Sequence, residues 1–82
     1  MFTLLFIEDD EAIRTALRLV LEDEGYEVAV AGDGETGISL FGQINPDLVL
    51  LDLRLPDISG FEVCRAIRRT SITPFIMVTA QT

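Results

Sequence analysis

The chain has 82 residues, enough for one small domain, and 49% of them are hydrophobic, which indicates a folded chain. Its 14 acidic and 6 basic residues give a net charge of −8, so the chain as a whole repels a phosphate backbone. Histidine is absent and Cys64 is the only cysteine, which excludes most zinc, haem and histidine-based catalytic sites.

The same composition predicts where the protein resides. Cys64 has no partner for an internal disulfide, which fits a reducing cytoplasm, and we interpret it as a small core residue. No stretch reaches the roughly 20 apolar residues of a membrane span, and the N-terminus lacks the features of a signal peptide. We therefore expect a cytoplasmic protein without membrane contact.

Four short apolar segments alternate with helical patterns along the chain. Their continuous apolar character predicts strands that are covered on both faces, as in a parallel sheet. The strands are expected at residues 3–7, 26–31, 47–51 and 74–78.

Three helices are expected between these strands. The first has an apolar stripe at helical spacing and is followed by Gly25, a residue suited to a left-handed cap. This inward stripe comprises Ile13, Ala16, Leu17, Val20 and Leu21. The second helix is short, about 35–41, with Ile38 and Phe41 inward and Gly37 weakening it.

The third helix is expected over about 60–69, with Phe61, Cys64 and Ile67 inward and three arginines outward. The alternating order predicts an α/β fold with right-handed crossovers and a doubly wound parallel sheet. This fold has four strands and three helices in one domain, residues 1–82. No helix follows the fourth strand to cover it, which is unusual for such a sheet.

Acidic residues follow two of the predicted strands. Glu8 and Asp9 end the first strand, and Asp52 ends the third, while Thr79 follows the fourth. Ligands of open parallel sheets bind at the carboxyl ends of the strands, so these side chains are expected to converge if the strands are neighbours. Clustered carboxylates repel one another, and a divalent cation relieves that repulsion.

Magnesium is the cation that suits this set, because it prefers oxygen and binds through few carboxylates plus waters and a phosphate. Glu8, Asp9 and Asp52 are the candidate ligands, and the backbone carbonyl of Arg54 is a further one. An aspartate at such a site can act as a nucleophile and form an aspartyl phosphate, with the Thr79 hydroxyl donating to the phosphoryl oxygens.

Structural roles compete with this interpretation for each acid. Asp10 is predicted to cap the first helix, and Asp57 to cap or start the third. Asp52 alone is compatible with a simple turn. The convergence of groups from three strand ends is what favours the metal–phosphate pocket.

The segment GDGETG, residues 32–37, matches the G-x-G-x-x-G pattern of dinucleotide-binding proteins. A pyrophosphate bound there would lie beside Asp33 and Glu35, whose carboxylates would repel it. We therefore interpret the segment as a glycine-rich turn before a helix.

Together, the stretches LLFIEDDEAIR, DLVLLDLRLPDISGFEV and PFIMVTA resemble the receiver domain of bacterial two-component response regulators across essentially the whole chain. The resemblance implies a flavodoxin-like fold, Asp52 as phosphoacceptor, Glu8 and Asp9 as the magnesium-binding pair and Thr79 as the switch hydroxyl. Ala80 matches the small residue that follows the switch. The implied partner is a sensor histidine kinase, and the domain is a signalling element rather than an enzyme.

The resemblance covers the N-terminal two-thirds of a receiver and ends after the fourth strand. The family's fifth strand, last helices and conserved lysine have no counterpart, and the chain contains no lysine. An effector domain is also absent, so any contact with DNA is expected only through a domain outside this chain, as in a transcriptional regulator.

Two further functions compete with phosphoacceptance. One is a non-phosphorylated interaction module. Because the edge of the fourth strand and part of the first-helix stripe are expected to be uncovered, a homodimer or larger assembly is expected. The other, a haloacid-dehalogenase-type phosphatase, needs a second aspartate where this chain has Arg54.

Overall fold

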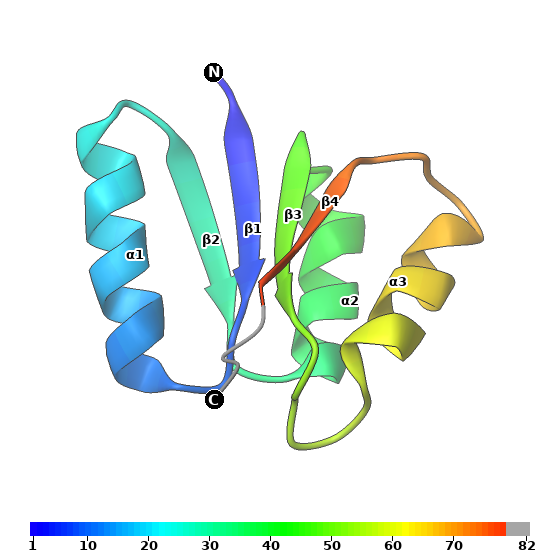
Figure 1. Ribbon diagram of the computed structural model, residues 1–82. Helices are drawn as coiled ribbons and strands as arrows, with labels where there is room; N and C mark the ends of the chain where they lie inside the picture. The colour runs from blue at the N-terminus through cyan, green and yellow to red at the C-terminus, as the bar shows by residue number, and fades with distance from the viewer. Residues whose placement is uncertain (79–82) are drawn as a thin grey trace.

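The computed structural model describes residues 1–78, in which strands and helices alternate along the chain (Figure 1). The elements are β1 (Thr3–Ile7), α1 (Glu11–Asp23), β2 (Glu27–Ala31), α2 (Gly34–Ile44), β3 (Leu48–Asp52), α3 (Gly60–Arg68) and β4 (Phe75–Val78). The predicted order is confirmed, and the strand bounds agree within one residue. Helix α2 ends at Ile44, three residues beyond its predicted end, and its C-cap Asn45 adopts a positive φ of 47°. Among the described residues, no helix is long and apolar enough to cross a membrane.

All four strands form one parallel sheet in the order β2-β1-β3-β4. Ile7 pairs with Leu51, and Asp52 pairs with Val78, so the carboxyl ends of β1, β3 and β4 meet at one edge. Figure 1 shows this edge at the bottom, with α1 on one side of the sheet and α2 and α3 on the other. The predicted doubly wound arrangement is confirmed.

The core lies between the sheet and helices α2 and α3. Its fully or nearly fully buried members are Leu5, Ile7, Ala31, Phe41, Val49, Leu51, Val63 and Ile67. Helix α2 lies very close to β1, because a Cβ added to Gly37 would overlap the Ile7 side chain. The glycine that weakens α2 intrinsically is therefore the residue that allows this contact.

The apolar stripe of helix α1 is largely uncovered. The stripe was expected to face inward with part of it left uncovered, and the exposure goes further than that, since no α1 residue is buried and Val20 is 58% exposed. The stripe lines an open apolar groove of about 410 Å³ formed by Phe6, Ile13, Ala16, Leu17, Val20 and Val78. Helix α1 packs mainly on β2 at one end of the sheet, which leaves its flank toward β4 uncovered.

Helix α3 corrects a second expectation. Phe61 was predicted to face inward, but it is 60% exposed, and Val63 is fully buried in its place. The helix begins at Gly60, and its buried positions are Gly60, Val63 and Ile67, so Phe61 lies about 100° away from that face. Cys64 is half-buried and packs against the core, as a small core residue would.

The predicted caps of α1 are both present. Asp10 accepts a hydrogen bond from the backbone N–H of Ile13 at 3.1 Å. Gly25 follows the helix with a φ of 98°, a conformation that glycine adopts without strain. Helix α3 is capped by Ser59, which accepts from Glu62 N at 3.2 Å, so the predicted role of Asp57 there is wrong.

Candidate functional site

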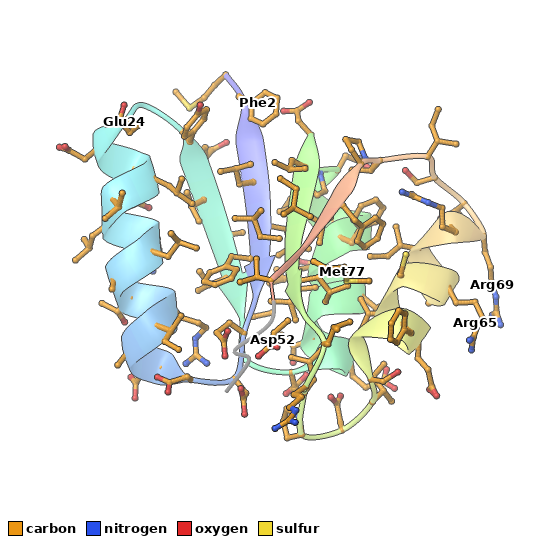
Figure 2. The ribbon with its side chains drawn as sticks, in the orientation of Figure 1. Phe2, Glu24, Asp52, Arg65, Arg69 and Met77 are labelled. Atoms are coloured by element: carbon orange, nitrogen blue, oxygen red, sulfur yellow. The ribbon has the colours of Figure 1, made fainter. Side chains whose placement is uncertain are left out.

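Three carboxylates meet at the carboxyl edge of the sheet. Glu8 and Asp9 follow β1, and Asp52 ends β3, the strand paired with β1. One carboxylate oxygen from each lies within 4.8 Å of the other two. Figure 2 shows Asp52 at this edge, far from Phe2 at the opposite end of the strands. The expected convergence of these acids is therefore observed.

Glu8 and Asp52 are each only 3% exposed, whereas Asp9 is exposed. The pKa of Glu8 is raised to about 7, mainly by burial, with smaller contributions from the negative charge of Asp52 and from hydrogen bonds with Asp9 and Asp52. The backbone N–H of Asp10, which donates to Glu8 Oε2 at 3.1 Å, opposes this shift. At neutral pH the cluster therefore resists full ionisation unless a cation neutralises it.

The backbone of the acidic pair is fixed from two sides. The N–H of Glu8 donates to the carbonyl of Ala31 at 3.0 Å, which extends the β1–β2 ladder. From α1, Arg14 Nη1 donates to the carbonyls of Glu8 at 2.9 Å and Asp9 at 3.1 Å. Sequence reasoning missed Arg14, although its position one turn after Asp10 places it beside the end of β1.

Asp52 is held by the loop that follows it. The backbone N–H of Arg54 donates to Asp52 Oδ1 at 3.1 Å, which orients the carboxylate. The proposed metal-binding role of the Arg54 carbonyl stays a prediction. Thr79 and Ala80 lie outside the described residues, and β4 is described only as far as Val78, the partner of Asp52.

Asp57 has a role that its sequence position did not indicate. Its two carboxylate oxygens accept hydrogen bonds from Gly34 N and Glu35 N, both at 2.8 Å, at the start of α2. These bonds, with that from Glu35 the largest, lower the pKa of Asp57. The first turn of α2 is also capped by Asp33, which accepts from Thr36 N at 2.7 Å. The amide donors of residues 34–36, where α2 begins within the GDGETG segment, are thus used within the chain.

The acidic cluster fits a hard divalent cation. It offers three carboxylates, and in residues 1–78 the only ion pair is elsewhere, between Arg18 and Glu22. Oxygen-only ligands at a partly open edge match the preference of Mg²⁺, which keeps several waters or phosphate oxygens in its shell. The arrangement can therefore hold a metal beside a buried aspartate.

The fold and this site together define an α/β domain with its ligand site at the carboxyl ends of the strands. The family description "Response regulator receiver domain" matches residues 4–82. The chain belongs to this family, and its function is in two-component signal transduction.

Two curated relatives carry regulatory names. The transcriptional regulatory protein AfsQ1 of Streptomyces coelicolor is 56% identical over 81 residues, 99% of this chain and 36% of the relative. The DNA-binding response regulator MtrA of Mycolicibacterium smegmatis is 43% identical over 79 residues, 96% of this chain and 35% of the relative. The chain thus spans about a third of the length of these relatives.

Solved structures agree in fold. The chemotaxis protein CheY4 of Vibrio cholerae has a TM-score of 0.94 and 33% identity, over 100% of this chain and 71% of that one. The response regulator TrrA of Thermotoga maritima, solved in complex with Mg²⁺ and BeF, has a TM-score of 0.92 and 38% identity, over 100% of this chain and 72% of that one.

Proposed function

We propose that this receiver accepts a phosphoryl group on Asp52, with Mg²⁺ held by Glu8, Asp9, Asp52 and the Arg54 carbonyl. The observation that supports it is the meeting of three carboxylates at the carboxyl edge of β1 and β3. The metal, when bound, would neutralise charge on the transferring group. The solved complex of TrrA with Mg²⁺ and BeF is consistent with such a site.

The proposed donor is a phosphohistidine on a sensor histidine kinase, the partner class of this family. A carboxylate oxygen of Asp52 forms the new O–P bond while the histidine N–P bond breaks, and the nitrogen keeps the electron pair. Asp52 is oriented for this by the Arg54 N–H, and its burial limits hydrolysis of the product. Thr79 is the proposed donor to the phosphoryl oxygens.

The test uses a small acyl phosphate, Mg²⁺ and intact-mass spectrometry of the 82-residue chain. We expect slow addition of one phosphoryl group, because the chain has no lysine to pair with it. Asp52→Asn should abolish the addition, and Asp23→Asn, which changes an exposed acid at the end of α1, should retain it. Undiminished labelling of Asp52→Asn would overturn the assignment.

The names of AfsQ1 and MtrA support a role in transcription. We propose that DNA contact belongs to a segment beyond these residues, since the chain itself has a net charge of −8. A DNA-binding assay on the 82-residue chain should show no saturable binding, and tight binding would contradict this division of roles.

A second candidate is a self-associating module. Strand β4 is a sheet edge within the described chain, and Ile76, Met77 and Val78 are 51%, 37% and 37% exposed. The apolar groove on α1 lies beside it. A homodimer that buries both features would remove an exposed edge and an apolar patch together.

A further inference from the structure

The loop from Leu53 to Ser59 joins β3 to α3 and carries Arg54, whose carbonyl is the proposed fourth metal ligand. Its two ends are closed together by a hydrogen bond from Gly60 N to the Leu53 carbonyl at 3.0 Å. The closure is tight, because a Cβ on Gly60 would lie 2.6 Å from the Asp52 carbonyl oxygen. The base of the loop is therefore fixed by its own backbone.

The C-terminal half of the loop is hydrogen-bonded to helix α2. Asp57 accepts two hydrogen bonds from the first turn of α2, both at 2.8 Å, although it is 23 and 22 residues away in sequence from its donors. The neighbouring Ile58 packs so closely against Gly34 that a Cβ added to Gly34 would overlap the Ile58 side chain. A carboxylate at a helix N-terminus is also favoured by the helix dipole.

Helix α2, to which the loop is hydrogen-bonded, is itself packed firmly on the sheet. Its Phe41 is buried in the core and its Gly37 packs against Ile7 of β1, the strand that leads into Glu8 and Asp9. The tether from Asp57 therefore connects the loop bearing one proposed ligand to the sheet that bears the others.

We propose that Asp57 is a positioning residue, which holds the Leu53–Ser59 loop so that the Arg54 carbonyl faces the carboxylate cluster. This inference rests on the proposed function. Asp57 itself stays bound to α2 and does not touch the metal or the phosphoryl group. Residues that orient metal ligands contribute to affinity although they make no contact with the metal.

The test compares two acids that cap the same helix. Asp57→Ala removes a cap and releases the loop, whereas Asp33→Ala removes the local cap, which accepts from Thr36 N, and leaves the loop attached. Both variants should lower Tm by comparable amounts, because each loses capping of α2. Magnesium titration followed by NMR, and amide hydrogen exchange without metal, are measured on the 82-residue chain.

We expect Asp57→Ala to weaken Mg²⁺ binding about tenfold and Asp33→Ala to leave it nearly unchanged. Asp57→Asn, which keeps one carbonyl acceptor, should be intermediate. Without metal, the amides of Arg54 and Gly60 should exchange faster in Asp57→Ala than in Asp33→Ala. Equal loss of affinity in both alanine variants would overturn the inference, because capping alone would then explain it.

Failure of the proposed function gives a different result. If the wild-type chain shows no Mg²⁺ response, the proposed metal site is wrong, and the exchange experiment then decides whether Asp57 fixes the loop. Faster exchange at Arg54 and Gly60 in Asp57→Ala alone would support the tether. Unchanged exchange in that variant would overturn it, whatever the metal does.

Discussion

The raised pKa of Glu8 predicts a pH-dependent stability that one substitution removes. The folded-state pKa is about 7 against an ordinary value of 4.5, so folding favours the protonated carboxyl. Ionising Glu8 therefore lowers the free energy of unfolding. This loss is absent below the unfolded-state pKa, grows as the pH rises from 4.5 to about 7, and is constant at higher pH. Metal-free protein should therefore lose stability over this window.

The shift corresponds to at most about 3 to 4 kcal/mol, at about 1.4 kcal/mol for each pKa unit. Glu8 is only 3% exposed, but solvent reaching the cluster beside the exposed Asp9 reduces the penalty, so we expect about 1 to 2 kcal/mol. Glu8→Gln removes the ionisation. In EDTA it should be more stable than wild type at pH 8 by about this amount, and the difference should shrink toward pH 5.

Urea unfolding followed by circular dichroism, repeated across this pH range, measures the effect. The chain has no histidine, so no imidazole contributes to the change. Glu11→Gln is the matched control, since it removes an exposed acid from the first turn of α1 and should keep the wild-type slope. Saturating Mg²⁺ should stabilise wild type at pH 8 and have little effect on Glu8→Gln. Parallel profiles for wild type and Glu8→Gln would refute the assigned pKa.

Three further outcomes are expected. Asp9→Asn should reduce Mg²⁺ binding sharply in calorimetry, and unchanged binding would remove Asp9 from the ligand set. Gly60→Ala should lower the free energy of unfolding by about 1 to 3 kcal/mol, since the added Cβ would meet the backbone of Asp52 and Leu53. Gly42→Ala is the control: Gly42 has open space around it, so the substitution should raise the free energy of unfolding by about 0.5 to 1 kcal/mol. The 82-residue chain should sediment as a dimer or larger species with little dependence on salt, and a folded monomer at high micromolar concentration would contradict this.

The order of elements and the acidic edge could be predicted from the sequence because both follow from local patterns plus one topological rule. Apolar runs of strand length mark β1 to β4, and parallel strands bring their carboxyl ends to the same edge. Given that rule, Glu8 and Asp52 come close together as soon as β1 pairs with β3, which it does.

The packing of individual helix faces was harder to predict because it depends on how a helix is rotated against the sheet and on what covers it. Phe61 and Val63 are both apolar, and the predicted start of α3 near residue 60 was correct, so the rotation of the helix against its neighbours is what buries Val63 rather than Phe61. The stripe on α1 has the spacing of a buried face, but burial also requires a neighbour on the other side. In the described residues that flank is an open groove.

The glycine-rich segment illustrates why a motif alone does not decide a phosphate site. The pattern 32–37 places free amides at a helix start, and free amides bind anions whatever their source. Here the anion comes from the same chain, since Asp57 occupies the amides of Gly34 and Glu35. A free phosphate would have to displace the Asp57 carboxylate. Because Asp57 is part of the same chain, its effective concentration at these amides is far higher than the concentration of free phosphate. The position of Asp57 is set by the path of the chain between β3 and α3. The residue spacing within the glycine-rich motif therefore cannot predict that Asp57 binds there.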